Sequence, residues 1–246
     1  MKFAILLLAA LPAFSQPVPL VYSTSGADAD AISPTVNAFR DMLGPLNAPG
    51  PAEHPEGRRE INWDGVPAQF TTPNDLPADF FNTTSARGAV LSNPGAPDIR
   101  FQVSAAEGAE RFDNLMAGYG QLFKTFSGAK LFISLANPAY DVDFRVPGTD
   151  RKALVSSFGA VFTNVAVPFT STVELFGADG KSLGRFAVQL APRGLSFLGV
   201  SFEERVIAKA RVTPGNIAAG QIEALADRRN IVAMDDFIFG EPGEIE

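Results

Sequence analysis

The sequence predicts an all-β protein, a jelly-roll-like antiparallel sandwich of two sheets with one short N-terminal helix at about residues 34–43. Between residues 154 and 240, short apolar runs rich in Val, Phe and Ile are separated by Gly, Pro, Asn and Asp, as in strands and turns. Several runs alternate apolar and polar residues, which is typical of a strand with one buried face. Helical spacing with clear start and stop signals is found near the N-terminus.

The N-terminus has the pattern of an export signal. Lys2 precedes the apolar run FAILLLAAL, and Ala13-Phe14-Ser15 fits a small-x-small cleavage site. The apolar run is too short for a membrane anchor, because a spanning helix needs about 20 residues. We therefore expect a signal peptide at residues 1–15, cleavage near Ser15, and a secreted or periplasmic mature protein.

The helix is expected to follow an extended N-terminal segment at residues 16–32. Ser33 is a good N-cap, and Pro34 suits the first helical position. Three apolar residues then share one helix face: Val36, Phe39 and Leu43. Gly44-Pro45 ends the helix, so we expect it to cover one end or edge of the sandwich.

Residues 33–240 are expected to form a single β-sandwich domain, followed by a C-terminal tail at 241–246. The clearest strand pair flanks Asp179-Gly180, which supplies the positive φ of a tight hairpin turn. The run 195–202 is apolar on both faces, which predicts an interior strand. Other strands are expected at 99–104, 131–135, 141–146, 154–165, 206–212 and 231–239.

Composition and charge narrow the possible functions. The chain has no cysteine, which excludes disulfides and thiolate chemistry. It carries 20 Lys and Arg against 27 Asp and Glu, and this acidic balance without a basic patch argues against a nucleic-acid partner. No later segment is apolar enough to cross a membrane, so we expect no span in the mature chain. The sequence does not indicate an oligomeric state.

Catalytic motifs are missing from the sequence. There is no nucleophile elbow, zinc-protease helix or phosphate-binding glycine loop. His54 is the only histidine and lies in a loop rich in Pro and Gly, so we assign it no catalytic role. The pairs Arg58-Arg59 and Arg228-Arg229 lie in polar stretches and are interpreted as solvated loop charge. We assign no catalytic residue.

Trp63, the only tryptophan, is flanked by Asn62 and Asp64. The structural interpretation is that Trp63 anchors the core and that Asp64-Gly65 forms a turn. The functional interpretation is a sugar-binding face, in which the indole stacks on a sugar ring while the amide and the carboxylate bind its hydroxyl groups. Asn62, Trp63 and Asp64 are therefore the candidate ligand-binding residues.

Four aspartates are candidate metal ligands: Asp141, Asp143, Asp235 and Asp236. Calcium takes six to eight oxygen ligands in irregular geometry, so scattered carboxylates can bind it. Asp141 and Asp143 lie two apart on a strand and share a face, whereas adjacent residues point to opposite faces. We therefore expect only one of Asp235 and Asp236 to face inward. The alternative to calcium is an inward carboxylate that accepts hydrogen bonds from backbone amides.

Three phrases carry a resemblance to a known group. They are REINWDGV at 59–66, FGAVFTNV at 158–165, and GLSFLGVSF at 194–202 with AMDDFIFGEP at 233–242. They resemble secreted, largely uncharacterised bacterial proteins, some of which carry a C-terminal sorting tail of the PEP-CTERM type. The sequence ends at Glu246 without an apolar tail, so we expect a freely exported product.

The last predicted strand is also similar to the last strand of jelly-roll carbohydrate-binding modules. In those modules an aspartate near this strand often helps to hold a structural calcium. The similarity implies that role for Asp235 or Asp236.

Three hypotheses for function follow. The first is an exported, non-enzymatic β-sandwich that binds carbohydrate or another extracellular polymer, with calcium as a possible structural ion. The second is a structural or matrix protein without a small ligand. The third is a polysaccharide hydrolase that depends on carboxylates such as Asp64, Asp141 or Asp143.

Overall fold

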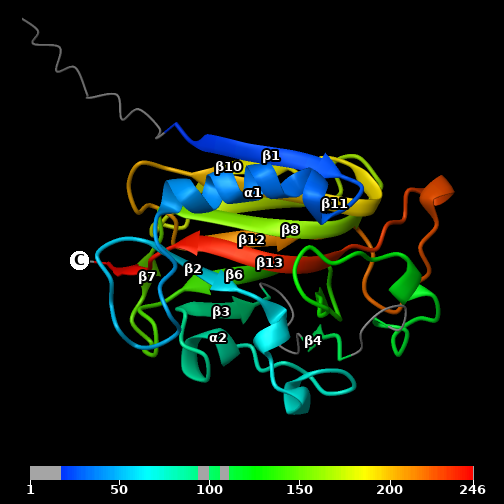
Figure 1. The fold of residues 1–246 in the computed structure, drawn as a ribbon, viewed down its shortest axis with the longest axis horizontal. Coiled ribbons are helices and arrows are strands. Elements are labelled where there is room, and N and C mark those ends of the chain that lie inside the picture. Colours follow the sequence, from blue (N-terminus) through cyan, green and yellow to red (C-terminus); the bar gives the residue numbers. More distant parts are fainter. Residues whose placement is uncertain (1–17, 94–99, 106–110, 246) are drawn as a thin grey trace, which may run out of the picture.

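The computed structural model describes residues 18–93, 100–105 and 111–245, and it confirms the predicted all-β, two-sheet antiparallel sandwich (Figure 1). The larger sheet, sheet A, contains in spatial order β1 (Leu20–Gly26), β11 (Ala191–Ser201), β8 (Ser157–Val165), β13 (Ala233–Gly240), β5 (Phe132–Ser134) and β4 (Phe101–Val103). β2 (Arg58–Ile61) also pairs with β13. The expected signal peptide lies outside the described residues.

The second sheet, sheet B, has five strands: β10 (Ser182–Ala187), β9 (Thr172–Phe176), β12 (Lys209–Thr213), β6 (Tyr140–Phe144) and β3 (Ala89–Ser92). β9 and β10 form the hairpin predicted around Asp179-Gly180. β11 lies between β1 and β8, as expected for an interior strand. A short ladder joins β7 (Ala153–Leu154) to β14 (Gly243–Glu244).

The main core lies between the two sheets and is rich in aromatic rings. Trp63 is fully buried there, stacked on Phe132 with ring centroids 4.3 Å apart. Phe237 of β13 packs edge-on against Trp63 at 5.2 Å. Full burial of such large rings supplies much of the apolar area that stabilises a sandwich.

The N-terminal helix is longer than predicted. α1 spans Ala29–Leu43, and its N-cap is Asp28, whose carboxylate accepts the backbone N–H of Ala31 at 3.1 Å. Pro34 therefore lies inside the helix rather than at its start. The prediction placed the start at Ser33-Pro34 and overlooked that Ile32 extends the apolar face of Val36, Phe39 and Leu43 by one turn.

Within the described residues, the expected extended segment at 16–32 is part strand and part helix. Within the described part of it, residues 20–26 form β1, which pairs with β11, and residues 29–32 are helical. α1 packs on the outer face of sheet A, where Phe39 contacts Tyr22 and Phe197 at centroid distances of 5.4 and 5.5 Å. The helix thus covers part of one sheet face rather than plugging an end.

Residues 241–245 are part of the fold and not a loose tail. Glu241 is buried, and the following residues form β14. Short helical turns complete the described chain: η1 (Trp63–Gly65), η2 (Ala68–Phe70), α2 (Phe80–Thr83), η4 (Tyr119–Gln121) and η5 (Leu225–Asp227). Among the residues placed in the structure, no helix has the length and apolar character to span a membrane.

Candidate functional site

A β-bulge in β13 places Asp235 and Asp236 on the same face of sheet A. The pairing of β13 with β8 shifts between Met234 and Phe237, so two residues of β13 oppose one residue of β8. Both aspartates are buried, and their side chains converge on one loop. The expectation that only one of them could face inward is therefore wrong, because it assumed regular alternation.

Asp235 is held by backbone amides. Its Oδ2 accepts the N–H groups of Phe126 and Ser127 at 2.6 and 3.3 Å, whereas its buried Oδ1 has no protein partner in the described structure. Burial raises the pKa of Asp235 well above its usual range, and the neighbouring Asp236 carboxylate raises it further. Proton uptake by Asp235 thus relieves both desolvation and charge repulsion.

Asp236 connects the loop to α1. Its Oδ1 accepts the hydroxyl of Ser127 at 2.6 Å, and its Oδ2 lies 3.2 Å from the guanidinium of Arg40. Arg40 also binds Glu60, which in turn accepts a hydrogen bond from Arg58 at 2.7 Å. Burial raises the pKa of Asp236, although Ser127 and Arg40 oppose that shift.

Asn62 and Asp64 bind the same loop from the other side. The Asn62 amide donates to Ser127 Oγ at 2.8 Å, and Asp64 Oδ1 accepts the backbone N–H of Ala129 at 2.7 Å. Gly128 lies between them with φ +53°, and a Cβ there would stand 2.1 Å from Asp64 Oδ2. Three carboxylates, those of Asp64, Asp235 and Asp236, thus bind the loop 126–130. We call these three residues the acidic cluster.

Trp63 has the structural role of a core anchor. Its indole is fully buried, and its Nε1–H donates to the carbonyl of Asp235 at 2.9 Å. A sugar ring cannot stack on a ring that is already covered by Phe132 and Phe237. The expected sugar-binding face is therefore corrected: Trp63 is not a stacking platform.

The structure brings five predicted site residues together and separates two others. Asn62, Trp63, Asp64, Asp235 and Asp236 meet around the loop 126–130. Asp141 and Asp143 lie on β6 of sheet B instead. Asp141 forms a two-point ion pair with Arg211 at 2.7 and 3.0 Å and contacts Lys209 at 3.1 Å, while Asp143 accepts the Ser92 hydroxyl at 2.6 Å.

Neither group of aspartates fits a calcium ion. In the acidic cluster, one oxygen of each carboxylate accepts hydrogen bonds from backbone amides or a hydroxyl, and the guanidinium of Arg40 lies beside the other oxygen of Asp236. Asp235 Oδ1 and Asp64 Oδ2 are buried without a hydrogen-bond partner in the described structure. Asp141 is likewise neutralised by two basic side chains. Among the residues that the structure places, no group of three or more His, Asp or Glu side chains could hold a metal.

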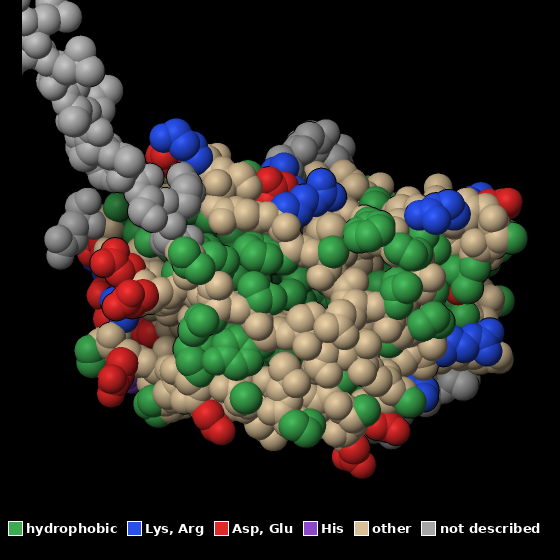
Figure 2. Space-filling model, turned by 90° about the horizontal axis from the view of Figure 1, so that it is seen from above, with side chains coloured by type: hydrophobic (Ala, Val, Ile, Leu, Met, Phe, Trp, Pro, Cys, Tyr) green, Lys and Arg blue, Asp and Glu red, His purple; other side chains and the backbone are tan. Residues whose placement is uncertain are grey.

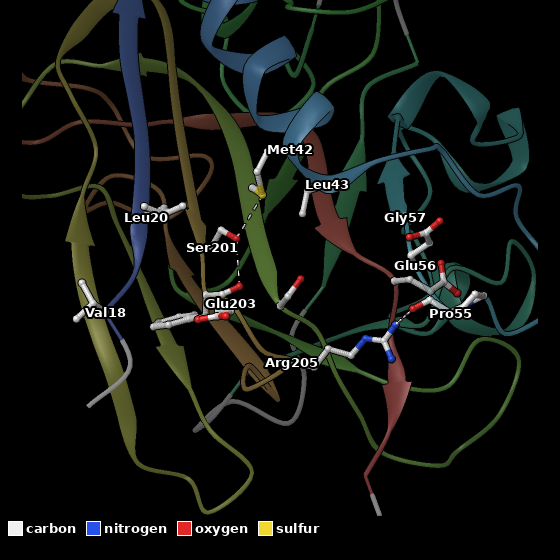
Figure 3. Close-up of a pocket in the computed structure, with 13 residues that line it drawn as sticks. Val18, Leu20, Met42, Leu43, Pro55, Glu56, Gly57, Ser201, Glu203 and Arg205 are labelled. Carbon is white, nitrogen blue, oxygen red and sulfur yellow. Dashed lines mark hydrogen bonds between the residues drawn. The ribbon is translucent and has the colours of Figure 1, made fainter. Parts of the chain in front are cut away.

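A groove lies at the C-terminal end of α1, and we call it the helix-end groove (Figure 3). It has a volume of about 780 Å³ and continues the outer face of sheet A past Leu43, the last residue of the helix. Val18 and Leu20 line one side, while Met42 and Leu43 lie at the helix end. This volume lies within the usual range of ligand pockets, about 300–1,000 Å³.

The opposite side of the helix-end groove is polar. Pro55, Glu56 and Gly57 line it, and the guanidinium of Arg205 donates to the carbonyl of Pro55 at 2.6 Å (Figure 3). Glu203 enters from the end of β11. Glu56 and Glu203 are exposed, and neither forms an ion pair with another described residue. Their carboxylates can therefore accept hydrogen bonds from a ligand.

A second groove adjoins the first and shares Pro55 and Arg205 with it. It has a volume of about 570 Å³ and is lined mainly by polar residues, including Glu53, His54 and Glu244. Arg151 bridges Glu53 and Glu244, so these two carboxylates are engaged. Together the two grooves form a long, open path that suits an extended ligand better than a compact one.

A buried ion pair lies beneath the helix-end groove, which Glu241 helps to line. Arg59 and Glu241 are both fully buried and form a two-point contact at 2.6 and 2.7 Å. Arg59 also donates to the carbonyl of Ala52 at 2.8 Å, which fixes the loop before β2. The interpretation of Arg58-Arg59 as solvated charge is therefore wrong for Arg59, because β2 turns it inward together with Ile61.

The sequence interpretation did not find the helix-end groove. Its lining residues come from six separate segments, and no local motif joins them. One usable signal was the helix end itself: Met42 breaks the polar pattern beside Leu43, and it is 38 % exposed. A second signal was the apolar pair Val18 and Leu20 in a segment expected to lie at the surface.

Comparisons with known proteins do not identify a function for this chain. No protein-family profile and no curated protein matches the sequence. One solved structure, the enzymatically active domain of tailspike protein 4 from bacteriophage CBA120, is similar over 69 % of this chain and 21 % of its own, with 9 % identity and a TM-score of 0.26. The chain spans about a fifth of that structure, and a likeness this slight supports no conclusion. Function has to be inferred from the groove and the acidic cluster.

Proposed function

We propose that the protein is an exported binding module that holds a segment of an extracellular polymer, with polysaccharide as the first candidate, in the helix-end groove. One observation carries the proposal: the open groove has an apolar side and two exposed carboxylates, and it continues into a second groove. Apolar surface and a few polar groups are what a ligand site requires. The N-terminal export pattern supports an extracellular ligand.

The ligand is thus proposed to bind at the surface groove and not at the buried Trp63. Glu56 and Glu203 are acceptors for hydroxyl groups, while the aliphatic side chains of Leu20 and Met42 can cover the apolar face of a sugar ring. Calcium is not part of this proposal, because no group of three or more His, Asp or Glu side chains in the described chain could hold a metal.

Affinity electrophoresis or calorimetry against a polysaccharide panel tests the proposal. We expect Met42→Lys and Glu203→Lys each to weaken binding about tenfold or more, since the first fills the groove with charge and the second removes an acceptor. The matched controls are Ile222→Lys and Asp227→Lys. Both residues are exposed and lie in the loop around η5, at the opposite end of the molecule (Figure 1).

Each outcome separates the hypotheses. Equal losses in the groove variants and the controls, or no binding to any polymer, would overturn the proposal in favour of the structural or matrix hypothesis. Loss of binding in a chelator would restore the calcium hypothesis. Turnover that is abolished by Glu56→Gln or Glu203→Gln would identify a hydrolase at the same groove.

A further inference from the structure

The strands at the ends of the two strand orders, β1 and β4 in sheet A and β10 and β3 in sheet B, are protected to different degrees. The outer side of β4 accepts backbone hydrogen bonds from Thr72 and Leu76, at 2.9 and 2.8 Å. The outer side of β3 is likewise covered, because Leu91 donates its N–H to the carbonyl of Ala78 at 2.8 Å. Loops and turns therefore satisfy the free backbone groups of both strands.

β10 is protected in another way. Its pairing with β9 is interrupted by a register shift between Ser182 and Gly184. The strand also carries Arg185 and is preceded by Lys181. Bulges and basic side chains at an edge are common means of preventing strand addition.

β1 has none of these protections within the described part of the chain. It pairs with β11 over seven residues without a register shift, and no described loop forms a backbone hydrogen bond with its outer side. The Ser25 hydroxyl donates to the Gln189 side chain at 3.3 Å, which leaves the backbone groups of that side free. Its sequence, LVYSTSG, contains no charged residue and no proline. Leu20 and Val21 are 60 % and 50 % exposed, and Figure 2 shows apolar side chains gathered on the side of the molecule where β1 lies.

We propose that β1 pairs antiparallel with the β1 strand of a second copy of the chain, so that two copies of sheet A become one continuous sheet. A strand without charges can face itself across a two-fold axis without like charges opposite each other. With the axis near Ser23, Leu20 of one copy lies opposite Gly26 of the other. The pairing satisfies the free backbone groups and covers Val21.

The charge distribution is compatible with this arrangement. The protein has a formal net charge of −7, and the exposed glutamates near β1, including Glu203 and Glu56, lie at the end of the strand beside Leu20. Antiparallel pairing places these acidic ends at opposite sides of the dimer. The repulsion between these acidic ends is therefore screened at physiological ionic strength, where the Debye length is about 8 Å.

The test is the molar mass of the full chain over a wide concentration range, by sedimentation or light scattering. We expect a dimer that forms as concentration rises, and a dissociation constant raised about tenfold or more by Val21→Lys, since an edge lysine opposes strand addition. Ile222→Lys is the matched control, because Ile222 is 65 % exposed at a distant loop. Ser23→Lys serves as a second variant if Val21→Lys fails to fold.

Amide hydrogen exchange provides an independent readout, with greater protection of residues 20–26 at high concentration as the expected result. A wild-type chain that stays monomeric, or a dimer unaffected by both lysine variants, would overturn the proposal. Protection of β1 by an extended peptide from another protein, while the chain stays monomeric, would also overturn it. Val21 does not line the helix-end groove, so this test is separate from that of ligand binding.

Discussion

The acidic cluster and the helix-end groove use the same carboxylate chemistry in opposite ways. In the acidic cluster, Asp235 and Asp236 are buried and accept hydrogen bonds from the loop 126–130. In the groove, Glu56 and Glu203 are exposed and have no ion-pair partner among the described residues. A buried carboxylate that accepts hydrogen bonds from a loop fixes that loop, whereas an exposed carboxylate keeps its acceptors for a ligand.

The buried ion pair beneath the groove should show the largest effect. Arg59→Met leaves Glu241 buried without its cation, and we expect a loss of about 3–5 kcal/mol in the free energy of unfolding. Urea denaturation measures it. The double variant Arg59→Met/Glu241→Leu removes both charges and should regain most of the loss. Equal stability of the single variant and the wild type would show that Glu241 finds another partner or water.

The next effect concerns the acidic cluster. Gly128→Ala should lower the free energy of unfolding by about 1–3 kcal/mol, because φ is +53° and the new Cβ would collide with the Asp64 carboxylate. Asp64 cannot move without losing the amides of Ala129 and Lys130. Gly65→Ala is the matched control, since a Cβ at Gly65 meets no atom within 4 Å. Similar losses of stability in the two variants would contradict a close, fixed contact between Gly128 and the Asp64 carboxylate.

The pH dependence of stability should distinguish a buried carboxyl from an exposed one. The pKa of Asp235 is raised above its ordinary value of 3.8 in the folded state, so its protonated form stabilises the fold at low pH. That contribution is complete below the unfolded pKa and is lost as pH rises through the folded pKa. Over this window the folded state binds more protons, with a slope of at most about 1.4 kcal/mol per pH unit for one proton.

Asp235→Asn imitates the protonated carboxyl, so its free energy of unfolding should fall less steeply over the same window. Thermal or urea unfolding at a series of acidic pH values measures the difference. Asp227→Asn, at an exposed position, is the control and should follow the wild type. Parallel curves for Asp235→Asn and the wild type would show that Asp235 is ionised throughout.

The smallest effect on stability is expected at the groove. Glu203→Lys should change the free energy of unfolding by no more than about 0.5 kcal/mol, because Glu203 is exposed and has no ion-pair partner in the described chain. The same variant should lose ligand binding. A stability loss similar to that of Gly128→Ala would mean that Glu203 stabilises the fold. The groove carboxylates would then not differ from those of the acidic cluster in this respect.

Strand positions were accessible from the sequence because alternation and turn residues act locally. The hairpin at Asp179-Gly180 and the interior strand β11 follow directly from such patterns. The aspartate pair at 235–236 could be identified, but its geometry could not. The bulge arises from pairing with β8, more than 70 residues away in the sequence, and this pairing turns both side chains to one face.

The helix start and the groove show two further limits. Asp28 and Ile32 carried the signals of an earlier helix start, but Pro34 favoured a later one, and burial of the longer apolar face outweighed the proline. The groove depends on where α1 ends over sheet A and on the loop before β2. Such a juxtaposition of distant segments is a tertiary property that no local motif records.

The position of β13 governs when the protein can fold. β13 is the last long strand in the chain, yet it lies at the centre of sheet A, between β8 on one side and β5 and β2 on the other. The two halves of the sheet have no hydrogen-bonded connection until residues 233–240 arrive. Assembly therefore waits for nearly the whole polypeptide, and such long-range pairing is slow. A chain still emerging from a ribosome can form the pairing of β1, β11 and β8, but it cannot complete sheet A before β13 is available.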